Sequence, residues 1–283
     1  MRIANLKGRL VIVRDRIAVD VNTASDGTFS SDPQAVYETW DEFVSWAAGV
    51  DFSAGIQFDE TDLLAPVPVP RQIFAIGLNY RDHAAESGQS IPDFPLVFTK
   101  FVSSITGPTA TVELPEGSVD WEVELVAVIG KPARKVSAAD AWHYVAGLTV
   151  GQDLSERRSQ LRGPAPQFSL GKSFPGFSPI GPVVVTIDEF ANPDALRIQS
   201  ELQGAGIDGV LSLQDGNTRN MIFTVPQLVE HLSGVLTLFP GDIIFTGTPA
   251  GVGMGRDPKL FLTSGQRLTS TIEGIGQLRN ALL

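Results

Sequence analysis

Three acidic residues have the types and the spacing of a metal site. Glu122 and Glu124 stand two positions apart in a segment that reads as a strand, so their side chains project from the same face. The strand continues into the apolar run LVAVIG and should be at least half buried, where two carboxylates must protonate or meet positive charge. Asp153 follows another strand-like run, 148–151, as a third ligand from a neighbouring strand would. A bound cation is the simplest solution for all three.

The spacing of Glu122 and Glu124 also fits an edge strand whose glutamates face solvent, and from spacing alone that alternative is slightly favoured. The rest of the composition restricts the choice of metal. The chain has no cysteine and only three histidines, which excludes thiolate-bound zinc or iron. Three carboxylate oxygens with waters suit Mg²⁺ or Mn²⁺, and Ca²⁺ can substitute for either.

A candidate acid–base pair lies nearer the N-terminus. If the chain is helical from Asp82 onward, His83 and Glu86 stand three positions apart on one face, within reach of each other. Imidazole can take a proton from water near neutral pH, and a neighbouring carboxylate fixes its tautomer. A capped helix start with surface charges explains the segment about equally well. The loop that follows, 87–94, has the composition of a mobile lid.

Cations and hydroxyls follow the acidic residues along the chain. Arg157 and Lys172 come soon after Asp153, where they could receive a substrate carboxylate or a developing oxyanion. The segment 241–249 reads as a strand that runs into a tight turn and would expose backbone N–H groups and the hydroxyl of Thr248. By itself this turn could also be purely structural.

The overall charge excludes some partners. A net charge of -11 and a pI near 4.7 leave no basic stripe for nucleic acid. No stretch approaches 18 uninterrupted apolar residues and the first residues lack the pattern of a signal peptide, so we expect a cytoplasmic protein without a membrane partner. The segment 247–253 lacks the lysine of a phosphate-binding loop, which argues against an ATPase.

The elements that must position these residues divide into two domains. Residues 1–66 read as short strands and an amphipathic helix around 36–46, which predicts a small N-terminal α/β domain. The connector PVPVPRQ is extended and stiff, because alternating prolines prevent a helix. Residues 67–283 should be mostly sheet, with helices at 137–147 and 224–234. The strands are expected at 73–76, 96–99, 122–129, 148–150, 183–187 and 243–245.

Eight segments, taken in order, closely resemble the fumarylacetoacetate hydrolase family, in its acylpyruvase-like and 2-hydroxyhepta-2,4-diene-1,7-dioate isomerase-like branch. The resemblance runs from about residue 73 to residue 280. Its segments are GLNYRDHAAE, FTK with Ser103 and Ser104, VDWEVELVAVIGK, 147–160, GKSFPGFSPIGP, LQDGNTRNMIF, PGDIIFTGTPAGVG and IEGIGQLRN. Two departures flank Asp153: Gly151-Gln152 where relatives often have Ala-Asn, and Glu156 where a small residue is frequent.

The resemblance implies an α+β, mainly β fold with a rolled mixed sheet, flanking helices and usually a homodimer. It implies that Mg²⁺ or Mn²⁺ is bound by the three carboxylates. It also implies a family His-Glu pair on a lid helix. The residues expected to act on substrate are His83, Glu86 and Lys172 in catalysis and Arg81, Arg157, Gln160 and Thr248 in binding.

The function expected is that of a hydrolase acting on C–C bonds in ketonic substances. A 2,4-dioxo acid, an acylpyruvate or a fumarylpyruvate-like compound, would be cleaved through a metal-stabilised enolate. Oxaloacetate decarboxylation, or isomerisation or dehydration of a related 2-oxo acid, is the alternative. A protein that only binds ligand or uses calcium to stiffen its fold is a rival of another class.

Overall fold

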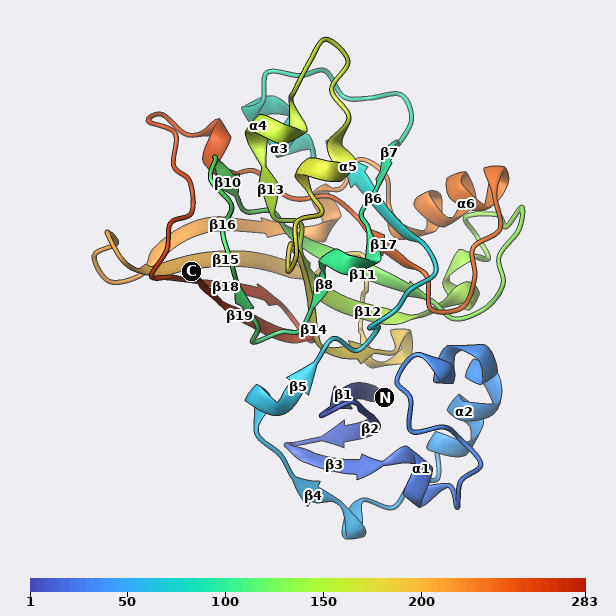
Figure 1. Cartoon of the computed structure of the whole chain (residues 1–283). Helices are drawn as coiled ribbons and strands as arrows, with labels where there is room; N and C mark the ends of the chain where they lie inside the picture. The colour runs from blue at the N-terminus through green and yellow to red at the C-terminus, as the bar shows by residue number, and fades with distance from the viewer.

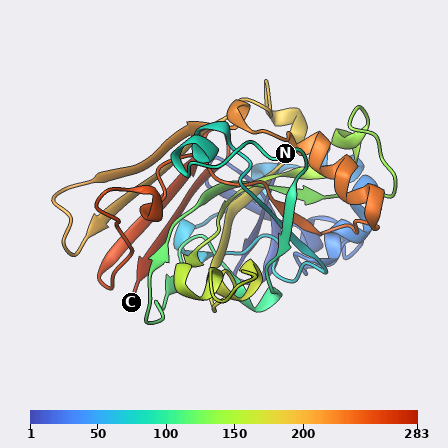
Figure 2. The same cartoon turned by 90° about the horizontal axis from the view of Figure 1, so that it is seen from above.

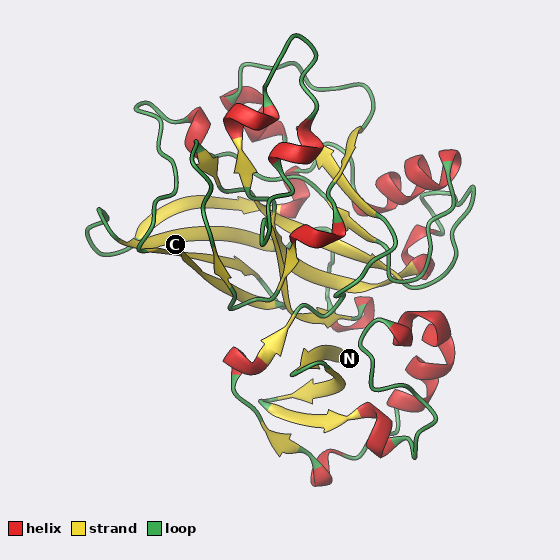
Figure 3. Cartoon of the chain, viewed as in Figure 1, coloured by secondary structure: helices red, strands yellow, loops and turns green.

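The computed structural model describes all 283 residues, and its helices are short and lie around the sheets (Figures 1 and 3). The strands are β1 (Arg2–Leu6), β2 (Arg9–Arg14), β3 (Ile17–Asp20), β4 (Ile56–Gln57), β5 (Leu63–Leu64), β6 (Ile73–Gly77), β7 (Leu96–Thr99), β8 (Ile105–Thr106), β9 (Thr111–Val112), β10 (Val119–Asp120), β11 (Val123–Ile129), β12 (Val145–Gln152), β13 (Ser155–Glu156), β14 (Ser178–Val185), β15 (Arg197–Gly204), β16 (Leu211–Asn217), β17 (Ile243–Phe245), β18 (Gln266–Ile272) and β19 (Gly276–Leu282). The α-helices are α1 (Val21–Ala24), α2 (Trp40–Ala47), α3 (Arg81–Glu86), α4 (Arg157–Gln160), α5 (Phe168–Gly171) and α6 (Val225–Val235).

The main sheet has twelve strands, ten of them in the order β4-β3-β2-β1-β14-β12-β11-β17-β6-β7. Strands β5 and β8 pair with β1 and β14 outside this path. Most pairs are antiparallel, but β17 runs parallel to β6 and β14 parallel to β8. The predicted α+β, mainly β fold with a mixed sheet at its core is therefore confirmed.

A second sheet of five strands, in the order β16-β15-β18-β19-β9, packs against the first. Seen from above, it lies at one end of the molecule and α6 at the other (Figure 2). Strands β10 and β13 form a separate two-stranded sheet. The strands of the second sheet were not predicted from the sequence.

Strand β11 lies at the centre of the core, and every one of its residues is buried. Alternate side chains point to opposite faces. Val126 and Val128 belong to a cluster with Trp40 and Phe43 of the N-terminal part. Leu125, Ala127 and their neighbours on the other face belong to a cluster with α6 and the second sheet. Burial on both faces explains the uninterrupted apolar run in the sequence.

Two predicted helices are confirmed. The apolar spacing from Val36 to Trp46 corresponds to a 3-10 turn, Ala35–Thr39, followed directly by α2. The other is α6, which begins after Thr224 with a capping box to Gln227.

The helix predicted at 137–147 is wrong. Ser137 does donate to Asp140 across 2.7 Å, as a capping motif would, but only a 3-10 turn, Ala141–Tyr144, follows. Strand β12 then begins at Val145, because pairing with both β11 and β14 outweighs the local helix signal. Gly147 does not end a helix: a Cβ there would meet the carbonyl oxygen of Val185 at 2.4 Å, so it permits close strand packing.

The N-terminal part is joined to the rest by the main sheet itself. Strand β1 pairs with β14 at Arg2–Val185 and Ile3–Val184. The division at residues 66 and 67 stays a prediction, since the sheet and one apolar cluster extend across it.

None of the helices combines the length and the apolar character that a membrane-spanning segment requires.

Candidate metal centre and active site

The three carboxylates of the sequence analysis lie together. Glu122 immediately precedes β11, Glu124 lies within it, and Asp153 immediately follows β12. These strands are antiparallel neighbours with Val123 opposite Gln152, so the start of one meets the end of the other. One oxygen from each carboxylate lies within 4.8 Å of the others, and all three side chains are buried.

Three cations surround this cluster. Lys172 donates to Glu122 across 2.8 Å and to Asp153 across 2.5 Å. Lys100 donates to the other oxygen of Asp153 across 2.5 Å and to the carbonyl oxygen of Lys172. Arg157 Nη1 lies 2.8 Å from Glu122. Lys100 was not predicted, although it lies in the FTK segment, because nothing local to that segment indicates burial beside Asp153.

The charges around Glu124 are not balanced. Its carboxylate accepts the backbone N–H of Gly247 across 2.7 Å. Burial raises the pKa of Glu124 well above its usual range, and the charges of Asp153 and Glu122 raise it further. Burial would also raise the pKa of Glu122, but Lys172 and Arg157 lower it to about 2.

A divalent cation fits this donor set. Glu124 is a buried carboxyl without a cationic partner, and the other two carboxylates lie close enough to share one ion with it. An all-oxygen set of this kind suits Mg²⁺ or Mn²⁺.

Two glutamines of the surrounding strands hold the backbone at the first ligand. Gln152 accepts the N–H of Glu122 across 2.9 Å and donates to Ser270 of β18. Gln214 of β16 accepts the next N–H, that of Val123, across 3.1 Å. Both are buried. These hydrogen bonds tie the backbone at Glu122 to the second sheet, a connection that was not predicted from the sequence.

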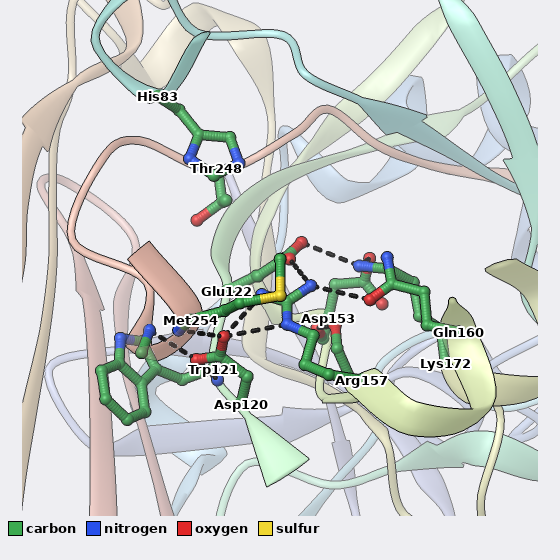
Figure 4. Close-up of polar contacts among 12 residues, drawn as sticks. His83, Asp120, Trp121, Glu122, Asp153, Arg157, Gln160, Lys172, Thr248 and Met254 are labelled. Atoms are coloured by element: carbon green, nitrogen blue, oxygen red, sulfur yellow. Dashed lines mark hydrogen bonds and ion pairs between the residues drawn. The ribbon is translucent and has the colours of Figure 1, made fainter. Parts of the chain in front are cut away.

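Arg157 lies between Asp120 and Glu122 (Figure 4). Its Nε and Nη2 donate to Asp120 across 2.9 and 2.7 Å, and Nη1 donates to Gln160 across 2.9 Å. Burial would lower the pKa of Arg157, but Glu122 and Asp120 raise it. Asp120 was not predicted as a site residue, although it precedes the ligands by two and four positions.

Glu156 immediately precedes α4, the short helix that begins with Arg157. Its carboxylate accepts the backbone N–H groups of Ser118, Arg158 and Ser159 across 2.9, 3.1 and 2.7 Å. The departure from the family pattern noted at this position therefore supplies a helix cap.

His83 and Glu86 lie on α3 as expected, with Nδ1 and Oε2 separated by 3.2 Å. The other oxygen of Glu86 accepts the N–H of Gly251 across 2.9 Å. At the start of the helix, Asn79 donates to the carbonyl oxygen of Thr246 across 2.7 Å. The helix is thus tied to the neighbouring loops at both ends. His83 itself stands apart from the ion-pair cluster (Figure 4).

Leu78 precedes this helix with φ 53°, a left-handed conformation that is rare for leucine, and it lines the cavity described below.

A cavity of about 140 Å³ brings most of the predicted residues together. Its polar wall includes His83, Glu122, Arg157, Gln160, Lys172 and Thr248. Arg81 is not among the lining residues, since its guanidinium donates to the carbonyl oxygen of Met221 across 2.8 Å. The remaining wall is largely apolar.

The sequence matches known proteins over most of its length. Residues 72–283 match the family model described as fumarylacetoacetate (FAA) hydrolase, C-terminal. The mitochondrial oxaloacetate tautomerase FAHD2A of Homo sapiens is 42% identical over 226 residues, 79% of this chain and 70% of the human protein.

Solved structures match the whole chain. A Mycobacterium smegmatis protein provisionally described as HpcE is 51% identical, with a TM-score of 0.93 over 100% of this chain and 99% of that one. Maleylpyruvate hydrolase from Sphingobium sp. SYK-6, solved with manganese(II) and pyruvate, is 27% identical, with a TM-score of 0.79 over 100% of this chain and 99% of the hydrolase.

Proposed function

The chain belongs to the fumarylacetoacetate hydrolase family, and on this basis we propose that it is a metal-dependent hydrolase that cleaves a C–C bond of an acylpyruvate. The observation that carries the proposal is that one cavity is lined both by Glu122, a member of the buried carboxylate triad, and by His83, which is paired with Glu86. A carboxylate triad alone would serve a structural ion, but a histidine held by a glutamate adds the group that a proton transfer needs.

Glu122, Glu124 and Asp153 would hold Mg²⁺ or Mn²⁺, with Ca²⁺ as a substitute. When bound, the ion supplies Lewis-acid stabilisation of the negative charge that develops on the substrate. The manganese and pyruvate in the related maleylpyruvate hydrolase support this assignment, because pyruvate is also a product of acylpyruvate cleavage.

The residues of the chain would act as follows. Lys172 and Arg157 face the cavity beside Glu122 and attract the substrate carboxylate. Gln160 can donate its amide N–H to an oxo oxygen, since only its side-chain oxygen is engaged, by Arg157. Thr248 also lines the cavity, but its hydroxyl already donates to the carbonyl oxygen of Val123 across 2.9 Å. Arg81, which was expected to bind substrate, has no part in this arrangement because it points to Met221.

His83, oriented by Glu86, would take a proton from a water molecule. The resulting hydroxide attacks the distal carbonyl carbon, the bond between that carbon and the methylene breaks, and its electron pair stays with the pyruvate part. The proton then passes from His83 to the methylene carbon. The products are a carboxylic acid and pyruvate, which balances the hydrolysis.

The test is to assay acylpyruvates by following pyruvate release, with purified protein stripped by a chelator and then reloaded with Mn²⁺ or Mg²⁺. We expect release only after reloading. Full activity of the stripped protein, or of the reloaded Glu124→Ala variant, would contradict the proposed mechanism.

A second candidate is a tautomerase acting on a 2-oxo acid, and the human relative favours it. The same histidine could move a proton between carbon and oxygen without water attack. Product analysis by NMR separates the two: hydrolysis yields two fragments, whereas tautomerisation leaves one molecule. The expected homodimer stays a prediction.

A further inference from the structure

An apolar groove continues outward from the active-site cavity. It is lined by Phe94, Pro95, Leu96, Val97, Phe98, Pro166, Gln167 and Phe168, and its volume is about 410 Å³. These residues come from β7, the edge strand of the main sheet, with the two residues before it, and from the first residue of α5 with the two residues before that helix (Figure 1). We refer to this set as the β7 groove.

The groove and the cavity share three wall residues, Leu96, Phe98 and Phe168. The two phenyl rings stand edge to face with centroids 5.6 Å apart. Phe98 also reaches the polar end of the cavity, because Lys172 Nζ lies 5.2 Å from the centre of its ring. A molecule held beside Lys172 can therefore extend along one continuous surface into the groove.

No residue that lines the groove is charged. Its single polar side chain, Gln167, is already engaged with Ser169: it accepts the backbone N–H across 2.9 Å and donates to the hydroxyl across 3.0 Å. The cations Arg157 and Lys172 belong to the cavity, and there they are paired with the carboxylates of Asp120, Glu122 and Asp153. A carboxylate placed in the groove would lose water without gaining a partner.

The groove is also open to water. Phe94 is 62% exposed, and Leu96 and Val97 are 42% and 43% exposed. Contiguous apolar surface of this kind commonly marks a binding site. The cavity, at about 140 Å³, is comparable to an engineered apolar cavity that holds benzene, so a substrate much larger than a short dioxo acid must extend beyond it.

We propose that the β7 groove binds the distal group of the substrate, and that this group is neutral and apolar: an alkyl chain of several carbons or an aromatic ring. This inference deepens the proposed function and rests on it, since it assigns the acyl part of the acylpyruvate. It distinguishes the chain from enzymes whose substrates carry a second carboxylate at the distal end.

The test uses binding, so that it does not depend on which reaction occurs. Isothermal titration calorimetry on the Mn²⁺-loaded protein compares 2-oxooctanoate with 2-oxooctanedioate, which have the same chain length but differ in a terminal carboxylate. We expect the monoacid to bind at least about tenfold more tightly, equivalent to about 1.4 kcal/mol. Equal binding, or tighter binding of the diacid, overturns the inference and leaves the hydrolase proposal in place.

The reverse outcome is also informative. If the monoacid is preferred but no acylpyruvate is cleaved, the hydrolase proposal fails while the assignment of the groove stands.

A variant then locates the contact. Phe94→Asp lies in the groove but outside the cavity, and it should weaken 2-oxooctanoate about tenfold while leaving pyruvate binding unchanged. Val210→Asp is the control, because Val210 is also an exposed apolar residue but lines neither the groove nor the cavity. It should leave the affinities for 2-oxooctanoate and for pyruvate unchanged. If Phe94→Asp instead alters the oligomeric state in light scattering and leaves both affinities intact, a second copy of the chain covers the groove and the inference is wrong.

Discussion

The side-chain oxygen of Gln152 accepts the backbone N–H of Glu122 across 2.9 Å, so a neutral amide at the end of β12 holds a proposed metal ligand just before the start of β11. The other end of the same amide donates to Ser270 across 2.9 Å. The first ligand is thereby tied to the second sheet.

Replacing Gln152 by leucine should weaken metal binding while the three carboxylates remain. The Glu122 N–H would lose its acceptor in a buried site, and loss of such outer partners typically lowers metal affinity about 10–100-fold. Mn²⁺ titration followed by electron paramagnetic resonance measures the affinity. Gln266→Leu is a matched control, because Gln266 is also buried and also makes two hydrogen bonds, but outside the site. An equal effect of both variants would show that Gln152 acts only through general stability.

Removing the charge of Glu124 should separate metal binding from folding. Because burial and the charges of Asp153 and Glu122 raise its pKa, the Glu124→Gln variant without metal should melt no lower than the wild type. Mn²⁺ at a hundredfold excess over Kd should stabilise the wild type by about 2.7 kcal/mol and the variant far less. Differential scanning calorimetry with and without Mn²⁺ measures both. An equal Mn²⁺ effect on the two proteins would exclude Glu124 as a ligand.

Replacing His83 by asparagine should abolish proton abstraction from water without abolishing binding of the metal ion. We expect kcat to fall by about 10²–10⁴-fold while the Mn²⁺ affinity stays unchanged, because His83 lies outside the carboxylate cluster. Steady-state kinetics on an acylpyruvate measures the loss. His143→Asn, at an exposed residue, should leave kcat unaltered. If His83→Asn keeps kcat within about twofold, another group transfers the proton.

The cap at Glu156 should make stability depend on pH in one direction. Burial raises the pKa of this carboxyl, but the N–H groups of Ser118, Arg158 and Ser159 outweigh burial and leave the pKa below its ordinary value. A lowered pKa in the folded state stabilises the protein above the ordinary value of about 4.3, and this contribution is lost as the pH falls below it. The melting-temperature difference between the wild type and Glu156→Gln should therefore shrink on acidification.

The control for this prediction is Glu42→Gln, on the exposed side of α2. Its melting difference from the wild type should stay small throughout. A Glu156→Gln difference that grows as the pH falls would have the wrong sign for a lowered pKa.

Gly151 should tolerate no side chain, because Val126 and Phe245 fill the space beside it. A Cβ there would lie 2.5 Å from Val126 Cγ2 and 2.7 Å from Phe245 Cε1, so Gly151→Ala should lower the free energy of unfolding by about 1–3 kcal/mol. Adding Val126→Ala should recover part of the loss. Gly234→Ala has open space and lies within α6, so it should instead stabilise by up to about 1 kcal/mol. Urea denaturation measures all three, and a neutral Gly151→Ala would disprove the steric argument.

The sequence predicted the strands whose burial shows as apolar runs. Strands β7 and β17 have the expected bounds, and β11 begins one residue later than expected, so that Glu122 lies just outside it. Their side chains alone signal the structure, because nearly every residue is β-branched, aromatic or aliphatic.

The second sheet was missed for a physical reason that also concerns the site. Its inward face carries buried polar residues, among them Ser200, Gln214 and Ser270, so the strands lack a clear apolar alternation. Two of these, Gln214 and Ser270, belong to the hydrogen bonds that hold the ligand segment. Two of the residues that obscure the sheet in the sequence are thus the ones that connect it to the proposed metal centre.

In the site, too, local spacing in the sequence was informative, whereas contacts between distant parts of the chain were not predictable. Glu122 with Glu124, and His83 with Glu86, could be proposed from spacing within single segments, since residues two or three apart share a face. Lys100 could not, because its contact with Asp153 joins residues 53 positions apart. Arg81 is the reverse case: it lies two residues from His83, yet it does not line the cavity and its guanidinium donates to the carbonyl oxygen of Met221.

The pairing of β1 with β14 makes the two parts of the chain dependent on each other for folding. Cutting the protein after Ala65 would leave β14 with unpaired N–H and C=O groups and would uncover apolar residues such as Val126 and Val128. An exposed edge beside an apolar face invites association with other chains. The two parts are therefore expected to denature in a single cooperative transition, and the shortened chain to aggregate rather than to survive as an independent enzyme.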